Sequence, residues 1–188
     1  VGMLVLPGDV AGMPCVDDAA ESPVLPPVPP LLHPGAGVIP RMADILGSSQ
    51  RITFLCGIGC AGVEKDIVAL ARHLQAPVAY TLRAKDLLEK DNPNAVGMTG
   101  LLGWGAAVHA VLDCDVLVMW GTDFPYRDFL PRKVRVIQVD TDAAVLGRRV
   151  PLVQAVQADA GVVARHLLQE VPPNQSDDFL STMLNHHA

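Results

Sequence analysis

The sequence predicts an α/β fold: a doubly wound parallel sheet with helices on both of its faces. Short β-rich runs alternate with runs of helical period, which is typical of parallel strands joined by helical crossovers. The run DVLVMWG at 115–121 is apolar after its first residue, as expected of a strand that is covered on both faces. Between the first predicted strand and the first predicted helix, the sequence fits G-x-G-x-x-G with Gly57, Gly59 and Gly62.

The first half of the alternation contains β-rich runs that lead into amphipathic ones. RITFLC is a short run of this kind, and Ile67, Leu70 and Leu74 then recur on one helical face. Pro77 opens the next β-rich run, and a run of small residues precedes the apolar one. Strands are therefore expected at 51–56, 77–82 and 115–121, and helices at 61–75 and 104–114.

The second half repeats the pattern. VRVIQVD is rich in β-branched residues, and a short helical run after it is closed by Gly147. LVQAVQAD reads as a further strand, and AGVVARHLLQEV has the period of an amphipathic helix. Strands are expected at 134–140 and 152–159, and helices at 142–147 and 160–171.

Composition excludes several classes of function. The chain has 188 residues, a net charge of −6 and no basic stripe, which argues against nucleic acid as a partner. No apolar run approaches the roughly 18 residues of a membrane span, and the first ten residues lack the basic start of a secretory signal. The four cysteines show no CxxC spacing, and Cys56 and Cys114 are expected to be buried. These features favour a cytoplasmic protein.

The ends of the chain differ from its middle. Pro23–Pro40 has a proline density that prevents regular helix or sheet and favours extended chain. After Val171 the sequence turns polar, with a short helix expected near Phe179–Leu184. The expected division is a segment 1–12, a proline-rich linker 13–40, a globular domain 41–171 and a linker or tail 172–188.

Two threonine–glycine corners mark the expected ligand site. Thr99-Gly100 and Gly121-Thr122 each stand where an apolar element meets a loop. In doubly wound sheets, ligands bind beyond the carboxyl ends of the strands, where glycine allows close approach and free amides suit a phosphate. We therefore expect the two corners to converge and to hold one extended nucleotide.

An NAD site is the less favoured interpretation of the glycine pattern. The acidic residue usual at the end of the second strand is missing, since Thr81 and Arg83 occupy that region. The glycines also fit a tight turn that packs helix against strand. Asp140, at the end of VIQVD, is the other candidate acid: it fits either a ribose ligand or a cap for the helix that follows.

Four stretches together resemble a known family. LCGIGCAG, TLRAKDLLEKDNPNAVGMTGLLG, GTDFPYRDFLP and VIQVDTDAAVLGRR are similar, in this order, to the central domain of thiamine-diphosphate-dependent pyruvate oxidases. The resemblance is strongest to the quinone-reducing pyruvate dehydrogenases and covers roughly 42–171. It implies a Rossmann-like sheet. The opening VGMLVLPGDVAG resembles the end of the family's N-terminal, pyrimidine-binding domain, which would place 1–12 there.

The resemblance implies that this domain binds FAD. Asp140 would hold the adenosine ribose, and Asp159 matches a position near the adenine in the related acetolactate synthases. Ordinary loop packing is the alternative for Phe124 and Tyr126. The implied FAD-binding residues are Gly57, Gly59, Thr99, Gly100, Leu101, Leu102, Thr122, Asp123, Phe124, Pro125, Tyr126, Asp140 and Asp159.

The resemblance also implies a longer parent enzyme. In the parent, pyruvate or another 2-oxo acid is decarboxylated oxidatively on thiamine diphosphate and Mg²⁺, with electrons going to FAD and then to a quinone or oxygen. The glutamate and the Gly-Asp-Gly…Asn motif that hold thiamine diphosphate are not found in this sequence. The implied partners are flanking N- and C-terminal domains, further copies in a dimer or tetramer, and a membrane quinone reached from the cytoplasmic side.

Other classes of function stay open at this stage. The domain could lack FAD and serve as a scaffold in a thiamine-diphosphate decarboxylase or an acetolactate synthase-like enzyme. No catalytic or metal-ligating constellation is expected, since His73, His109 and His166 each lie on a predicted helix as polar surface residues.

Overall fold

The computed structural model describes residues 2–14, 28, 30–103 and 105–187. The chain divides into two compact units, Val1–Pro30 and Leu31–Ala188. In the first unit, α1 (Gly8–Ala11) is a single helical turn closed by a hydrogen bond from Ala11 N to Pro7 O, 3.0 Å long. Among the described residues, no helix is both long and apolar enough to cross a membrane.

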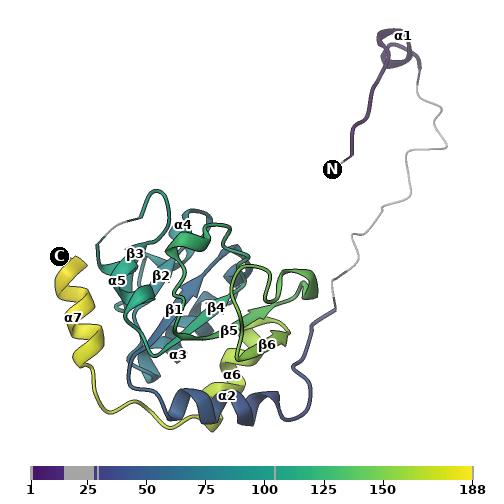
Figure 1. Cartoon of the computed structure of the whole chain (residues 1–188). Helices are drawn as coiled ribbons and strands as arrows, with labels where there is room; N and C mark the ends of the chain where they lie inside the picture. Colours follow the sequence, from purple (N-terminus) through teal and green to yellow (C-terminus); the bar gives the residue numbers. More distant parts are fainter. Residues whose placement is uncertain (1, 15–27, 29, 104, 188) are drawn as a thin grey trace. The chain divides into compact units, whose positions relative to one another are not determined.

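The second unit is built on one six-stranded sheet in which every pair of neighbours is parallel. The strand order is β3-β2-β1-β4-β5-β6, so the winding reverses between β1 and β4 (Figure 1). The predicted doubly wound sheet is confirmed. The strands are β1 (Ile52–Cys56), β2 (Val78–Tyr80), β3 (Ala95–Met98), β4 (Val116–Trp120), β5 (Arg135–Asp140) and β6 (Gln154–Gln157).

Side chains alternate along the central strands and build two separate cores. Val118 and Trp120 of β4 belong to one core, and Leu117 and Met119 to the other. The first core lies against α2 (Val38–Gly47), α3 (Glu64–His73) and α6 (Ala160–Glu170). The second lies against α5 (Ala106–Leu112) and α7 (Asp178–His187), which pack on each other (Figure 1).

Short helical turns follow several strands at the carboxyl edge of the sheet. They are η2 (Ile58–Cys60), η3 (Leu82–Ala84), α4 (Lys85–Leu88), η4 (Arg127–Phe129) and η5 (Ala143–Val145). The helix expected at 142–147 is only the 3-10 turn η5, in which Asp142 Oδ1 accepts a hydrogen bond from Ala144 N at 2.9 Å. One capped turn satisfies the backbone there without a longer helix.

Helix α2, strand β3 and helix α7 also depart from the sequence expectations. Helix α2 begins at Val38, inside the expected linker 13–40, and the compact unit already begins at Leu31. Residues 28 and 30–35 carry no regular structure, whereas 23–27 and 29 of the expected extended stretch lie outside the described residues. Strand β3 was not predicted. Helix α7 is longer than the expected one, and its Met183 is buried in the second core.

Candidate functional site

A cleft of about 680 Å³ opens at the carboxyl edge of the sheet. The loops that follow β1, β2, β3, β4 and β5 all contribute to its lining. This is the position in which doubly wound sheets bind ligands, and the volume lies within the usual range for ligand sites. The lining residues are Ile58, Gly59, Thr81, Leu82, Arg83, Met98, Thr99, Leu101, Leu102, Gly121, Thr122, Asp123, Phe124, Pro125, Tyr126, Asp140, Asp142 and Val145.

The two threonine–glycine corners meet in this cleft. Thr99 follows β3 and Thr122 follows β4, and both side chains are buried in the cleft wall. The two strands are separated in the sheet by β2 and β1. The parallel arrangement therefore brings together, at one edge, corners that lie more than twenty positions apart in the sequence.

The hydroxyl of Thr99 is an unsatisfied polar group of the cleft. Its Oγ1 is buried and has no hydrogen-bond partner among the described residues. A buried hydroxyl without a partner costs stability, and most such groups in folded proteins are paired. A ligand with a polar atom at this corner would supply the missing hydrogen bond.

Gly57 and Gly59 allow the loop after β1 to pack against the loop after β4. A Cβ on Gly57 would lie 2.4 Å from Gly121 O, and one on Gly59 would lie 2.6 Å from Gly121 Cα. Hydrogen bonds from Gly57 N to Trp120 O (2.8 Å) and from Gly59 N to Gly121 O (3.0 Å) hold the loops together. Only Gly59 of the pair lines the cleft, so the tight packing expected as the alternative accounts for Gly57.

Gly100 faces the aromatic residues of the β4 loop. Its φ is +102°, and a Cβ there would lie 3.3 Å from Phe124 Cζ and 3.4 Å from Tyr126 Cδ2. Gly100 itself does not line the cleft, whereas the two exposed leucines that follow it, Leu101 and Leu102, do. Glycine is therefore required by backbone conformation and by loop packing even before a ligand is considered.

Asp140 ends β5 and lines the cleft. Its Oδ1 accepts a hydrogen bond from Asp142 N at 3.0 Å, so it closes the turn that follows the strand. Burial raises the pKa of Asp140 above its ordinary value, and repulsion from Asp142 and Asp123 adds to the shift. The cap of η5 is Asp142 and not Asp140, so the capping role expected for Asp140 as the alternative is taken by Asp142, while the Asp140 carboxylate closes the preceding turn and lines the cleft.

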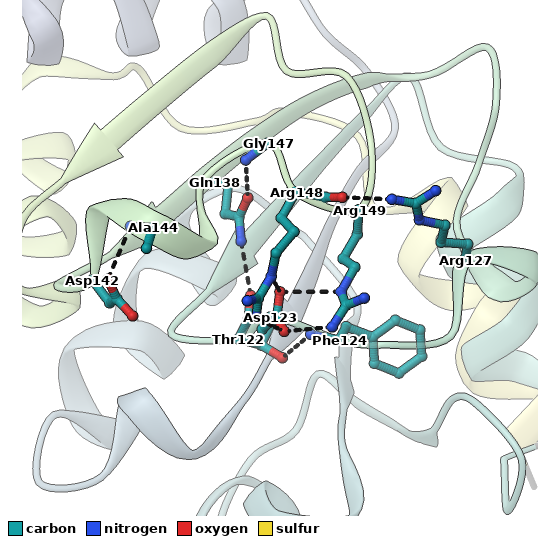
Figure 2. Close-up of polar contacts among 10 residues, drawn as sticks. All are labelled: Thr122, Asp123, Phe124, Arg127, Gln138, Asp142, Ala144, Gly147, Arg148 and Arg149. Atoms are coloured by element: carbon teal, nitrogen blue, oxygen red, sulfur yellow. Dashed lines mark hydrogen bonds and ion pairs between the residues drawn. The ribbon is translucent and has the colours of Figure 1, made fainter.

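The side chain of Asp123 is already engaged by two arginines. Nε of Arg148 and Nε of Arg149 donate to its Oδ1 at 3.0 and 3.2 Å, and Nη2 of Arg149 donates to its Oδ2 at 2.8 Å (Figure 2). Although burial alone raises the pKa of Asp123, the hydrogen bonds from Arg148 and Arg149 hold it below its ordinary value. Neither arginine was singled out by the sequence.

Asp159 is not brought to the cleft by this fold. It precedes α6, and its Oδ2 accepts a hydrogen bond from Leu32 N at 2.6 Å, while its own amide donates to Leu32 O at 3.0 Å. These two hydrogen bonds attach Leu32, near the start of the compact unit, to the N-terminus of α6. The expected adenine contact of Asp159 therefore stays a prediction without support from the cleft lining.

Sequence reasoning missed part of the cleft wall. Thr81, Leu82 and Arg83 line it, although Thr81 and Arg83 drew attention only because no acid stands there. Their position directly after a predicted strand was a usable signal, because all parallel strands present their carboxyl ends at one edge. Gln138, a buried polar residue within an apolar strand, was also passed over; it does not line the cleft, but it hydrogen-bonds to Thr122 O in the cleft wall.

His73, His109 and His166 lie on three different helices, α3, α5 and α6. His73 Nε2 lies 2.8 Å from Val171 O, whereas His109 and His166 lie at the surface. Within the described ranges, no group of three or more His, Cys, Asp or Glu side chains could hold a metal ion. Cys56, Cys60 and Cys114 are buried free thiols, as expected for Cys56 and Cys114.

Comparison with known proteins identifies the family. The profile described as "Thiamine pyrophosphate enzyme, central domain" matches residues 39–167. An "Uncharacterized 42.6 kDa protein in isoamylase 3'region" of Pseudomonas amyloderamosa is 37% identical over 187 residues, which cover 100% of this chain and 47% of that protein. A "Probable acetolactate synthase large subunit" of Methanocaldococcus jannaschii is 34% identical over 69% of this chain and 23% of its own length.

A pyruvate oxidase of Lactiplantibacillus plantarum is 26% identical over 83% of this chain and 25% of that protein. The relatives thus include different activities, and the chain spans less than half the length of each of these three.

The fold agrees with the sequence comparison. The crystal structure of a benzoylformate decarboxylase from Polynucleobacter necessarius superimposes with a TM-score of 0.67 and 19% identity, over 84% of this chain and 31% of the other. At this identity the likeness concerns the fold alone. Because the family profile covers well over half of the chain and the sheet has the matching architecture, the chain belongs to the thiamine pyrophosphate enzymes and spans their central domain.

Proposed function

We propose that this central domain binds FAD within an enzyme that oxidatively decarboxylates pyruvate or another 2-oxo acid. The observation that carries the proposal is the cleft itself: it joins both threonine–glycine corners, and it contains the buried hydroxyl of Thr99 that lacks a partner among the described residues. A polar ligand that reaches this corner would satisfy that group.

The side chains that line the cleft suit the chemical groups of FAD. Exposed apolar side chains, among them Leu101 and Leu102, suit a planar ring system, and Arg83 offers a positive charge for an anionic group. Asp140 would accept hydrogen bonds from the ribose hydroxyls. Bound FAD would supply a two-electron acceptor, and this domain would bind and orient it.

The rest of the proposed activity lies outside this chain. Thiamine diphosphate and Mg²⁺ would be held by the flanking domains of the full-length protein, in a dimer or tetramer. The reduced flavin would be reoxidised by a quinone or by oxygen. A quinone acceptor would place the protein in the cytoplasm with peripheral contact to the membrane.

The absorption spectrum of the purified full-length protein tests the proposal. After the protein is incubated with excess FAD and desalted, we expect flavin absorbance at about one flavin per chain. A colourless protein under these conditions overturns the FAD proposal and leaves the central domain as a scaffold.

A matched pair of glycine variants links any bound flavin to this cleft. Gly100→Val should abolish flavin binding, because its Cβ would meet Phe124 and Tyr126. Gly37→Val carries a comparable backbone penalty, with φ +79°, but no atom lies within 4 Å of its Cβ. Equal loss of flavin in both variants would show that strain rather than the cleft is responsible.

A further inference from the structure

We propose that Asp123, Arg148 and Arg149 form a latch, the Asp123 latch, which holds the β4 and β5 loops in the arrangement that binds the cofactor. In this role Asp123 is a positioning residue, not a cofactor contact. The inference rests on the proposed function of the cleft. It gives roles to two arginines that lie outside the cleft lining.

The latch joins segments that are far apart in the sequence. Asp123 lies in the loop after β4, and the two arginines lie between η5 and β6, 25 and 26 positions further on. Two neighbouring residues thus direct their guanidinium groups at one carboxylate (Figure 2). Charge-assisted hydrogen bonds of this kind are stronger than neutral ones, and bidentate ones also fix orientation.

Three further hydrogen bonds connect the same two loops. Arg127 Nη2 donates to Arg148 O at 2.8 Å, which ties η4 to the arginine segment. Gln138, on β5, donates from Nε2 to Thr122 O at 3.0 Å and accepts from Gly147 N at 2.9 Å (Figure 2). Gln138 is 1% exposed, and its hydrogen bond to Thr122 O is buried away from water. The junction therefore has a buried polar base beneath a partly exposed ion pair.

The β4 loop transmits this restraint to the other corner. Phe124 follows Asp123, has a positive φ of 20°, and donates from its amide to Thr122 Oγ1 at 3.1 Å. Its ring stands edge-on to Tyr126 and faces Gly100. A bulky residue rarely adopts a positive φ without support from its surroundings. Release of Asp123 should therefore loosen Phe124 and, through it, the Thr99-Gly100 corner.

The direction of the change in FAD affinity distinguishes a latch from a direct electrostatic effect of Asp123 on the ligand. Asp123 is an anion at the cleft, so its removal should favour a bound diphosphate if only the local field mattered. The latch predicts the opposite change, a weaker binding of FAD when the charge of Asp123 is removed. The Asp123→Asn variant keeps size and shape, and under the latch it should bind FAD roughly tenfold more weakly, the equivalent of about 1.4 kcal/mol.

The decisive experiment is a double-mutant cycle in the full-length protein. FAD dissociation constants are measured for Asp123→Asn, for Arg148→Gln/Arg149→Gln and for the triple variant, with Arg165→Gln as the control. Arg165 pairs with Asp66 away from the cleft lining, so its variant should match wild type. The latch predicts that each arm weakens binding about tenfold and that the triple variant is no worse than either arm. Additive losses, or an arginine arm with wild-type affinity, would overturn it.

Hydrogen–deuterium exchange without FAD keeps the test independent of the proposed function. We expect amide exchange at 97–103 and 121–126 to be faster in Asp123→Asn and in Arg148→Gln/Arg149→Gln than in the wild type. The far-ultraviolet circular dichroism of both variants should be unchanged, and Arg165→Gln should exchange at the wild-type rate. If the wild-type protein binds no flavin but exchange responds in this way, the latch stands and the FAD proposal fails. If flavin binds and exchange in both segments stays at the wild-type rate, the latch fails and the FAD proposal stands.

Discussion

Thr99 illustrates how a single residue can be suboptimal for folding and favourable for binding. Its backbone amide donates to Tyr80 O at 3.3 Å, but its buried hydroxyl has no partner among the described residues. Such a group destabilises the ligand-free chain until something supplies a hydrogen bond. Residues of this kind are expected where a fold retains polarity for a ligand.

The variant Thr99→Val separates the two effects. Valine has nearly the same shape, so we expect the ligand-free protein to become more stable by about 0.5–1.5 kcal/mol as the unpaired hydroxyl is removed. FAD affinity should fall roughly tenfold, because the ligand loses a hydrogen bond. Thermal unfolding and flavin titration of the same preparation measure both. A variant that is less stable and binds FAD normally contradicts this assignment.

Asp140 should show a related trade-off that depends on pH. Its folded-state pKa is raised, mainly by burial, so the folded chain holds the proton more tightly than the unfolded chain does. The resulting stabilisation is complete below the ordinary aspartate pKa of about 3.9 and is lost as pH rises through the raised value. At neutral pH the ionised carboxylate therefore costs stability.

We accordingly expect Asp140→Asn to raise the melting temperature at pH 7 and to have a smaller effect near pH 4. Asparagine retains the oxygen that accepts from Asp142 N, so the turn should survive. FAD binding should weaken by about 1–3 kcal/mol as the ribose loses a charged acceptor. Thermal melts across this pH range, with flavin titrations at pH 7, would test both; unchanged FAD affinity would remove Asp140 from the site.

At the scale of elements, the glycines that follow β1 determine how closely the loop after β1 can pack against the loop after β4 beside the cleft. Gly57→Ala would place a methyl group 2.4 Å from Gly121 O and 2.5 Å from Thr122 Cβ. Because the obstructing atoms are backbone and Cβ, they cannot move aside alone. We expect a destabilisation of about 1–3 kcal/mol, as for other overpacked sites.

Gly47→Ala is the matched control for this substitution. Gly47 ends α2, and its Cβ would lie at an ordinary 3.9 Å from Pro172 Cδ. Removal of a helical glycine should stabilise the chain by up to about 1 kcal/mol. Urea unfolding of the two variants gives the comparison, and a Gly57→Ala variant as stable as wild type would contradict the close packing of the two loops.

The whole molecule presents a cleft with an open, apolar rim. Leu101 and Leu102 are 69% and 65% exposed, and Leu82 is 59% exposed. Apolar side chains gathered beside a ligand site mark a surface that other parts of a protein or the ligand cover. The chain also spans less than half the length of the relatives described above.

We therefore expect the isolated 188-residue chain to bind FAD at least about tenfold more weakly than the full-length protein, a difference of about 1.4 kcal/mol. Burial of the leucine rim by neighbouring domains would supply an energy of this size. Flavin titrations of the two proteins under one buffer condition make the comparison. Equal affinities would mean that the central domain contains the whole site.

Sequence patterns were sufficient to predict the secondary structure of those segments that have a clear hydrophobic period of their own. The strand at 116–120 is apolar on both faces, and α3 and α6 carry apolar residues at helical spacing, so burial alone determines their conformation. Strand β3 contains Gly97 and is only partly buried, and it forms because β2 offers its free edge. Helices α2 and α7 likewise depend on the cores that they cover.

What the sequence by itself determined is the parallel α/β alternation, the broad family of thiamine pyrophosphate enzymes, and the two threonine–glycine corners that follow β3 and β4. Only the tertiary structure decided that these corners share one cleft, that Asp159 is used at Leu32, and that Asp123 is engaged by Arg148 and Arg149. The physical reason is that local patterns record burial and backbone preference along the chain. Which polar groups find partners depends on segments, distant in the sequence, that only the assembled sheet brings into contact.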